Sequence, residues 1–407
     1  MGPLSRPLSL ANGHGIKNRL FKSAMSEQLG DRQHNPTPEL ARLYRTWAEG
    51  GIGVSVTGNV MVDRTALGEP KNVVLDRDSD LGAFRRWALA GKAAEGQIWM
   101  QLNHPGKQIP AMLCKTPLAP SAIPLGRGLE KSFNPPAAMT EAQIQSAIQA
   151  FATAAELAKQ TGFDGVQIHG AHGYLVSQFL SPRHNQRDDD WGGSADKRMR
   201  FVLAVFRAIR ERVGADYPVG IKLNSADFMK DGFSENESMA VVEALAEAGI
   251  DLIEISGGTY ESPAMMSAGK RASTLKREAY FLDYAEQVRQ RVKVPLVVTG
   301  GFRSAAGMSE ALESGAVDMV GLARPMSLLP DLPKRVMAEP DFVLTMANPS
   351  TGFKALDKMG MLSITWYEFQ LERMGQGKAP KPGLSAWGAL LATFGRLGVY
   401  AFRQRRA

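Results

Sequence analysis

Short strand-like runs alternate with amphipathic helical stretches along most of this chain of 407 residues. The runs are rich in β-branched and other apolar residues, and the stretches between them repeat apolar residues at helical spacing. The predicted strands cover residues 19–24, 53–57, 97–102, 165–168, 219–223, 252–255, 296–299 and 319–322. The predicted helices cover residues 38–49, 81–95, 141–159, 197–213, 237–248, 281–292, 305–313 and 332–337. Eight such pairs favour a closed (β/α)8 TIM barrel, an α/β fold, over an open sheet.

Helix-capping signals agree with these boundaries. Thr37 precedes Pro38, which is typical of a capped helix start, and residues 140–143 form a capping box. Gly249 and Gly315 stand where a left-handed helix end prefers glycine. No Gly-x-Gly-x-x-Gly lies between a predicted strand and a helix, which disfavours a Rossmann domain.

Two connections, residues 102–139 and 257–280, are longer than such a barrel needs. Both leave the carboxyl ends of predicted strands, where (β/α)8 barrels keep their active sites. We expect these loops to form walls or lids over a pocket, with an inert surface excursion as the alternative. The barrel pattern is exhausted past Ala347, so we divide the chain into a barrel at 1–345 and a C-terminal extension at 346–407.

A final amphipathic helix is predicted after a linker at residues 378–383, with Ser385 as its cap. Its two predicted faces carry Trp387, Leu390, Leu391, Phe394 and Leu397 on one side, and Thr393, Arg396, Tyr400 and Arg403 on the other. Such a helix could lie on an anionic membrane surface, or dock on its own barrel or on a neighbouring subunit. Three glycines within it weaken a free helix and favour docking. The oligomeric state stays open.

The formal net charge of +7 is concentrated in the C-terminal tail. From residue 371 onward seven Lys and Arg residues stand against one Glu, which is +6 and leaves +1 for residues 1–370. The barrel therefore gives no reason to expect nucleic-acid binding. Cys114 is the only cysteine, which disfavours disulfides, a cysteine-rich zinc site and an iron–sulfur cluster. Without an apolar leader or a long apolar run, a cytoplasmic protein is expected.

His169 and His172 follow a predicted strand, and Tyr174 comes shortly after them. Two neutral imidazole N–H groups can hold one carbonyl or nitro oxygen, and a phenol beside them can supply a proton. The histidines could instead be structural, or form half of a metal site. Because no further cysteine ligand or His-Glu-x-x-His helix accompanies them, we predict no metal.

Glycine-rich segments follow the last two predicted strands, at residues 300–304 and 321–325. Glycine lets backbone N–H groups approach phosphate oxygens, and Arg324 offers a two-pronged donor. These segments indicate a phosphorylated ligand without naming it. Tight structural turns are the alternative interpretation.

The longest motif of the chain comprises residues 169–182 with Asn185, Arg187, Asp189, residues 191–194, Arg198, Arg200 and Phe201. It resembles the signature of the old yellow enzyme family, which comprises FMN-dependent ene reductases and related NAD(P)H:flavin oxidoreductases. Residues 18–26 and 101–106 resemble the family's first-strand and third-strand motifs, and the two glycine segments resemble its FMN phosphate motif. The resemblance covers roughly residues 5–340 in the family's order.

The resemblance implies a role for each matching position. The residues that would line the flavin are Ser23, Ala24, Met25, Ser26 and Gly58. Gln101 would pair with the pyrimidine edge and Lys222 would lie near N1 and C2=O, while Gly301, Ala323 and Arg324 would lie at the phosphate. His169 and His172 would bind the oxygen of the substrate's electron-withdrawing group, and Tyr174 would donate the proton.

The implied activity is reduction of activated C=C bonds, such as those of enones and nitroalkenes, by ping-pong hydride transfer from NADH or NADPH through flavin N5. An NADH oxidase, or a flavin-dependent demethylase or dehydrogenase of a small molecule, is an alternative. A flavin-free phosphate-binding lyase or isomerase, or a tail-tethered binding module, is an alternative from another class. Ser26 stands where many relatives carry Cys or Thr, so any tuning of the flavin potential by a thiol is lost. Glu27 and Gln28 follow it near a position where some relatives contact substrate through an aromatic residue, which leaves the physiological substrate open.

Overall fold

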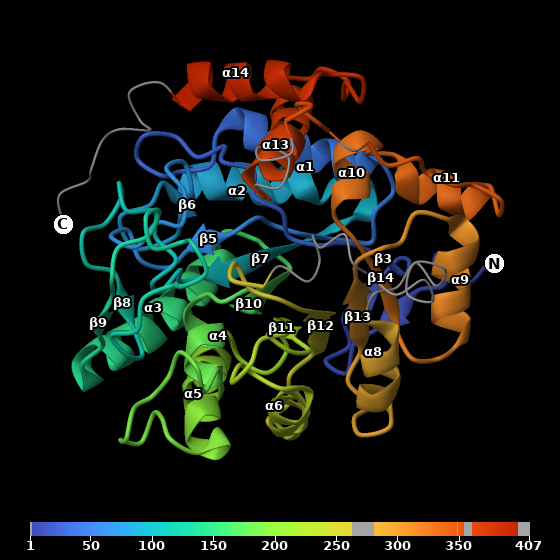
Figure 1. Ribbon diagram of the computed structural model, residues 1–407. Coiled ribbons are helices and arrows are strands. Elements are labelled where there is room, and N and C mark those ends of the chain that lie inside the picture. Colours follow the sequence, from blue (N-terminus) through green and yellow to red (C-terminus); the bar gives the residue numbers. More distant parts are fainter. Residues whose placement is uncertain (1, 263–280, 348, 354–359, 398–407) are drawn as a thin grey trace.

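Eight parallel strands close into a barrel in the computed structural model, which describes residues 2–262, 281–347, 349–353 and 360–397. The strands are β3 (Leu20–Lys22), β4 (Val54–Val56), β7 (Gln97–Asn103), β10 (Gly165–Gly170), β11 (Val219–Asn224), β12 (Leu252–Ser256), β13 (Leu296–Thr299) and β14 (Met319–Leu322). Each strand pairs with the next around the ring, and pairing of β10 with β7 closes it. The predicted (β/α)8 fold and all eight predicted strands are confirmed (Figure 1).

Helices follow the strands and form the outer layer (Figure 1). They are α1 (Pro38–Glu49), α2 (Leu81–Gly91), α3 (Glu141–Gln160), α4 (Leu175–Leu180), α5 (Ala195–Val213), α6 (Glu235–Glu247), α8 (Leu282–Arg289), α9 (Ala305–Glu313), α10 (Arg324–Leu328) and α11 (Leu332–Ala338), with the short 3-10 helices η1 (Pro3–Ser5) and η2 (Ala93–Glu95). Thr37 caps α1 by accepting a hydrogen bond from the backbone N–H of Leu40, and the capping box at Thr140 is present. Gly249 and Gly315 have φ of 88° and 73°, which confirms the predicted left-handed ends.

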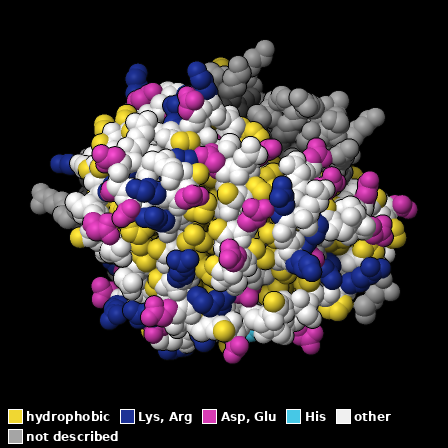
Figure 2. Space-filling view, turned by 90° about the horizontal axis from the view of Figure 1, so that it is seen from below, with side chains coloured by type: hydrophobic (Ala, Val, Ile, Leu, Met, Phe, Trp, Pro, Cys, Tyr) yellow, Lys and Arg dark blue, Asp and Glu magenta, His cyan; other side chains and the backbone are white. Residues whose placement is uncertain are grey.

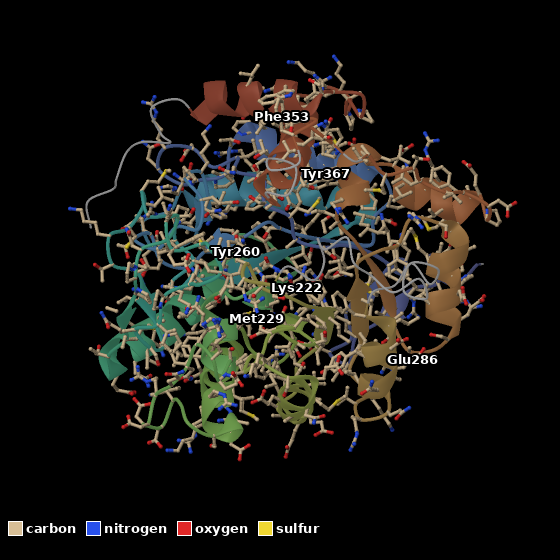
Figure 3. The ribbon with its side chains drawn as sticks, in the orientation of Figure 1. Lys222, Met229, Tyr260, Glu286, Phe353 and Tyr367 are labelled. Atoms are coloured by element: carbon tan, nitrogen blue, oxygen red, sulfur yellow. The ribbon has the colours of Figure 1, made fainter. Side chains whose placement is uncertain are left out.

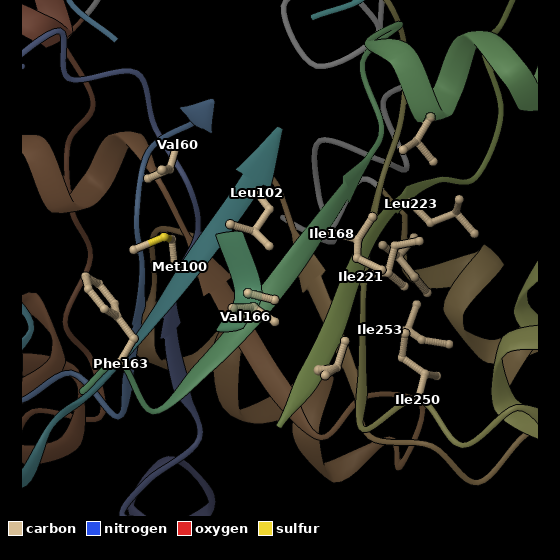
Figure 4. Packing of buried hydrophobic residues seen from close by; sticks show 14 of the residues in the cluster. Val60, Met100, Leu102, Phe163, Val166, Ile168, Ile221, Leu223, Ile250 and Ile253 are labelled. Carbon is tan, nitrogen blue, oxygen red and sulfur yellow. The ribbon is translucent and has the colours of Figure 1, made fainter. Parts of the chain in front are cut away.

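The main hydrophobic core lies between the barrel and its helices. Strand residues alternate, so that Met100, Val166, Ile168 and Ile221 point outward and pack among buried helix residues (Figure 4). This alternation leaves the other residues of each strand facing the interior of the barrel. The interior-facing residues near the carboxyl ends of the strands are therefore free to build a site.

Apolar side chains fill the amino end of the barrel. The hairpin of β1 (Leu8–Ser9) and β2 (Gly15–Ile16) contributes Leu8, Leu10 and Ile16 to this cluster, which also contains Trp99. The large Trp99 side chain needs glycine on the neighbouring strands, because a Cβ at Gly165 would lie 2.7 Å from its Cδ2. The amino end is thus closed by packing, and any ligand cavity has to open at the carboxyl end.

The loop at 102–139 differs from the expectation that it forms a cavity wall. It contains β8 (Leu118–Ala119) and β9 (Ala137–Ala138), and it packs on an excursion formed by β5 (Val60–Met61) and β6 (Val73–Val74). Among the described residues that line the cavity, none comes from 103–139. The loop instead supports a residue of the cavity lining: the Gln108 side chain donates a hydrogen bond to the backbone carbonyl of His172, with a distance of 3.1 Å. Most of the second long loop, residues 263–280, lies outside the described residues.

The C-terminal extension contains a helix that the sequence analysis did not predict, α13 (Gly360–Gly375). It packs on α1 and α10, and it lies with α14 (Ala386–Leu397) on one side of the barrel (Figure 1). Leu371 and Met374 of α13 join the main core. The division of the chain at residue 345 stays a prediction, but part of the extension is packed into the barrel's own core.

The predicted final helix is present as α14, and Ser385 caps it by accepting a hydrogen bond from the Gly388 N–H. Its buried contacts differ from the predicted apolar face. Ala386 and Ala389 are 1% and 0% exposed, whereas Trp387 and Leu391 are 43% and 71% exposed. The helix packs on α13, and its buried Ala389 lies in one apolar cluster with Trp366 and Tyr367 of α13.

The surface seen in Figure 2 carries Lys and Arg side chains interspersed with Asp and Glu. This mixture agrees with the near-neutral balance of residues 1–370. Among the described helices, none combines the length and apolar character that crossing a bilayer requires.

Candidate active site

A cavity of about 310 Å³ opens at the carboxyl end of the barrel. This volume lies at the lower end of the range that is typical of small-molecule sites. Its described lining residues are Ala24, Met25, Ser26, Asn59, Glu69, Gln101, His169, His172, Tyr174, Lys222, Gly257, Gly258, Thr259, Tyr260, Ala323, Arg324, Ser363, Ile364, Tyr367, Glu368 and Leu371. In Figure 3, Lys222 and Tyr260 lie near the centre of the barrel, with Tyr367 of α13 above them.

Ten of the thirteen predicted site residues line this cavity. They are His169, His172, Tyr174, Ala24, Met25, Ser26, Gln101, Lys222, Ala323 and Arg324. The barrel brings them together because the carboxyl ends of parallel strands meet on one rim. Among the described residues, no group of three His, Cys, Asp or Glu side chains has the arrangement of a metal site.

The other three predicted residues, Ser23, Gly58 and Gly301, lie beside the cavity and not in its lining. Ser23 is buried, and its Oγ lies 2.7 Å from Thr299 Oγ1. The Gly58 N–H donates to Glu27 Oε1 at 3.2 Å. Gly301 has φ of 100°, a backbone conformation that side chains other than glycine rarely adopt. Direct contact of these residues with a flavin stays a prediction.

A polar layer forms the floor of the cavity. Gln101 Nε2 donates to Gln167 Oε1 at 2.7 Å, and Gln167 Nε2 donates to Glu254 Oε2 at 2.8 Å. The Lys222 Nζ lies 3.0 Å from Glu254 Oε1, which also accepts a hydrogen bond from Thr299. This network crosses several neighbouring strands and holds the Gln101 amide and the Lys222 ammonium group in fixed positions.

The two histidines belong to one hydrogen-bonded chain. His169 Nδ1 lies 2.9 Å from Asn59 Oδ1, and His169 Nε2 lies 3.2 Å from His172 Nδ1. At the far end, His172 Nε2 lies 2.8 Å from the hydroxyl of Ser256. The inner nitrogens of the two rings therefore face one another at the cavity wall.

The backbone at His172 is strained. Its φ of 61° lies in the left-handed region, which costs a non-glycine residue on the order of 1–3 kcal/mol. The backbone N–H of His172 donates to Asn224 Oδ1 at 3.2 Å, and the residue forms a β-bridge with Thr259. These contacts from β11 and from the loop after β12 hold the ring beside His169.

Burial keeps both imidazoles neutral. Burial, and then the nearby Lys222 charge, lowers the pKa of His172 to about 3. The same causes, together with His172, hold the pKa of His169 well below its ordinary value. Burial and the neighbouring Tyr260 and Glu69 raise the pKa of Tyr174 well above its ordinary value. At neutral pH the site therefore offers uncharged imidazoles and a protonated phenol.

Donors and acceptors have to alternate along the histidine chain. The Ser256 hydroxyl can donate to His172 Nε2, which leaves the proton of His172 on Nδ1. Asn59 Oδ1 accepts the proton of His169 Nδ1, so His169 Nε2 accepts the N–H of His172. An oxygen ligand can receive an N–H donor from both rings only when Asn59 turns its amide and donates to His169 Nδ1. The pair thus differs from the expected two free donors: its tautomers depend on Asn59.

An Asn59→Asp variant should therefore bind a carbonyl ligand more weakly at pH 8. A carboxylate can only accept, so His169 keeps its proton on Nδ1 and loses one donor to the ligand; we expect the dissociation constant of a cyclic enone to rise about tenfold. The carboxylate also raises the pKa of His169, and protonation then restores both N–H groups. Calorimetric titration from pH 8 to pH 5 should show affinity recovering in the variant alone. Equal affinities of both proteins at pH 8 would contradict this assignment.

Seven polar lining residues were not singled out from the sequence: Asn59, Glu69, Thr259, Tyr260, Ser363, Tyr367 and Glu368. Asn59 directly follows Gly58 after a predicted strand, a position that could have indicated it. The three α13 residues could have been found from apolar residues at helical spacing, namely Leu362, Trp366 and Leu371, which are buried. Glu69 accepts a hydrogen bond from the Ser26 hydroxyl at 2.5 Å. The two residues are far apart in the sequence, so no local sequence pattern could have predicted this contact.

Residues 3–340 match the NADH:flavin oxidoreductase / NADH oxidase family. An NADH-dependent flavin oxidoreductase, iliE, from Hypocrea jecorina (strain QM6a) is 38% identical over 358 residues, which cover 82% of this chain and 88% of that protein. A protein of the same description from Neonectria sp. (strain DH2) is 39% identical over 82% of this chain. The chain spans only 47% of that second, longer relative.

Among solved structures, a 2-naphthoyl-CoA reductase in complex with 2-naphthoyl-CoA is similar, with a TM-score of 0.77 and 29% identity. The match covers 83% of this chain and 52% of that one. Morphinone reductase has a TM-score of 0.70 at 24% identity, over 86% of this chain and 92% of its own, and this likeness concerns the fold.

Proposed function

The chain belongs to the NADH:flavin oxidoreductase / NADH oxidase family, in agreement with its resemblance to old yellow enzyme, and from this premise we propose the reaction that it catalyses. The proposed enzyme uses FMN, with NADH or NADPH as the reductant, to reduce C=C bonds conjugated to a carbonyl or nitro group. One observation carries the proposal: two neutral imidazoles and a protonated phenol line the same cavity as the Gln101 amide and the Lys222 ammonium group.

The residues of the cavity fit FMN. Gln101 offers amide donor and acceptor groups for the pyrimidine edge, and Lys222, which is 3% exposed, offers a cation beside it. At the end of the last two strands, Gly300 and Gly301 have φ of 126° and 100°, and Arg324 lines the cavity. Glycine backbone and a guanidinium group are suited to a phosphate. FMN supplies the redox chemistry when bound, because its isoalloxazine ring can accept hydride from NAD(P)H and pass hydride to a second substrate.

The protein side of the reaction follows from three side chains. Once Asn59 has turned its amide, His169 and His172 orient the substrate by binding its carbonyl or nitro oxygen, and their N–H groups stabilise negative charge that develops on this oxygen. Tyr174 holds a proton at its phenolic oxygen and delivers it to the α-carbon of the substrate. Because burial keeps both imidazoles neutral, they act on the substrate oxygen as hydrogen-bond donors and not as charges.

The proposed function predicts two separable half-reactions. The purified holoenzyme should lose its yellow colour when NADH or NADPH is added without oxygen, and an enone or nitroalkene added afterwards should restore it. Each half-reaction is measured by flavin absorbance, and the saturated product is identified by mass spectrometry. Failure of both nucleotides to bleach the flavin would contradict the proposal. Recovery of colour with oxygen but with no member of an enone and nitroalkene panel would favour an NADH oxidase.

The remaining partners of the chain stay predictions. We propose that α14 provides the surface contact expected of the C-terminal extension, since Trp387 and Leu391 on its outer side are exposed. The choice between a membrane surface and a second subunit, and the cytoplasmic location, likewise stay predictions.

A further inference from the structure

The loop after β12 places a second phenol against Tyr174. The hydroxyl groups of Tyr174 and Tyr260 lie 2.8 Å apart, and both side chains line the cavity. The two residues differ in their access to solvent: Tyr174 is 7% exposed, whereas Tyr260 is 40% exposed. Tyr174 is therefore the more buried of the two phenols, and its hydroxyl group contacts the more exposed one.

We propose that Tyr260 is a proton relay that returns a proton from water to Tyr174 while Tyr174 protonates the substrate. This inference rests on the proposed function and adds a residue that acts through the proton donor. It gives a role to the loop after β12, which the family motifs of this sequence do not include.

The substrate's C=C π bond breaks as its β-carbon gains hydride that originates from NAD(P)H, and its α-carbon forms a C–H bond with the proton of Tyr174. The O–H bond of Tyr174 breaks, and a new one forms with the proton of Tyr260. Tyr260 then takes a proton from water at the cavity mouth. The sum is one NAD(P)H and one proton consumed for each C=C bond reduced.

Burial gives the relay its physical reason. Burial, together with the neighbouring Tyr260 and Glu69, raises the pKa of Tyr174 well above its ordinary value, so a phenolate there is costly. A donor that hydrogen-bonds to the developing phenolate removes much of this cost. The ordinary phenol pKa of 10.0 already keeps Tyr260 protonated at neutral pH, so both phenols carry their protons before the reaction starts.

Tyr260 is held in position from both sides. On its amino side, Gly258 accepts a hydrogen bond from Asn224 Nδ2 at 3.0 Å. On its carboxyl side, Glu261 Oε2 lies 3.1 Å from His184 Nε2, and Glu261 Oε1 accepts a hydrogen bond from the Gly126 N–H at 3.0 Å. These anchors come from the end of β11, from the segment between α4 and α5, and from the loop after β7. A loop residue fastened in this way can keep the short hydroxyl contact that proton transfer requires.

A Tyr260→Phe variant of the holoenzyme tests the relay. The rate at which NADH bleaches the flavin should be unchanged. The rate at which an enone restores the flavin colour should fall about tenfold, because Tyr174 then has to regain its proton without Tyr260. Tyr217→Phe is the matched control: the Tyr217 hydroxyl donates to the Phe163 carbonyl at 3.0 Å, near the amino end of β11 and away from the cavity. The control should keep both rates.

Proton counting separates a relay from a structural role. In mixtures of H2O and D2O, the wild type and Tyr217→Phe should show a curved dependence of the enone step on deuterium fraction, because two protons move together. Tyr260→Phe should show a linear dependence, because one proton moves. An unchanged rate or an unchanged curve in Tyr260→Phe would overturn the relay. Wild-type protein that no enone or nitroalkene reoxidises would instead refute the proposed function.

Discussion

A Tyr174→Phe variant is expected to react with NADH at the wild-type rate and to reduce an enone about 10²- to 10⁴-fold more slowly, the usual contribution of a positioned general acid. The phenol lies in the cavity beside the histidines and keeps its proton at neutral pH because burial raises its pKa. Phenylalanine preserves the ring, so binding of cofactor and substrate should change little. Anaerobic stopped-flow measurement of the two half-reactions gives both rates on one sample.

The two half-reactions provide the control within one protein. A loss of both rates would indicate a damaged cavity instead of a missing proton. If the enone step of Tyr174→Phe kept the wild-type rate, Tyr174 would not be the proton donor, and the water at the cavity mouth would become the candidate. The loss should exceed that of Tyr260→Phe, because the relay acts only through Tyr174.

A Lys22→Met variant is expected to lose about 3–5 kcal/mol of unfolding free energy, the usual cost of removing one partner of a buried ion pair. Lys22 points away from the barrel interior, and its Nζ lies 4.4 Å from the centroid of the Trp47 ring. It donates to the Val56 carbonyl at 2.6 Å and lies 3.8 Å from Glu27 Oε1. Both charged residues are buried, with 0% and 6% of their surfaces exposed.

The pH dependence of this loss has a definite sign. Burial raises the pKa of Glu27, and Lys22 opposes this rise. Without the lysine the folded-state pKa of Glu27 rises further, so the folded protein holds a proton that the unfolded chain releases. Stability then falls as pH rises above the unfolded value near 4.5. The deficit of Lys22→Met should accordingly be smallest near pH 5 and larger at pH 8, as measured by urea unfolding.

The matched control removes both charges. A Lys22→Met, Glu27→Gln double variant should recover much of the lost stability, because no unpaired charge remains in the core. The amide oxygen of the substituted side chain would still accept hydrogen bonds from the Gly58 N–H and the Tyr44 hydroxyl, which now bond to Glu27. A double variant as unstable as Lys22→Met at every pH would show that packing around Trp47, and not charge pairing, sets the loss.

The fold was predictable because its signals are local. Each predicted strand is a short apolar run that the barrel buries on both faces, and each helix start at Thr37 or Thr140 is set by contacts within four residues. The cavity residues that follow strands, such as His169, Gln101 and Lys222, were predictable as a group for the same reason. Once eight parallel strands close, the residues at their carboxyl ends meet on one rim.

The sequence by itself determined the barrel, its family and ten of the twenty-one described residues that line the cavity, because these depend on periodicity, on caps and on one long motif. Only the tertiary structure decided which of those residues are hydrogen-bonded to one another. Asn59 sets the tautomer of a histidine 110 positions away, and Tyr260 meets a phenol 86 positions away. Such pairs depend on which strand ends become neighbours and on how loops and α13 fold back over them. No local sequence pattern indicates that residues so far apart along the chain are in contact. The proposed proton path therefore forms only when the barrel closes.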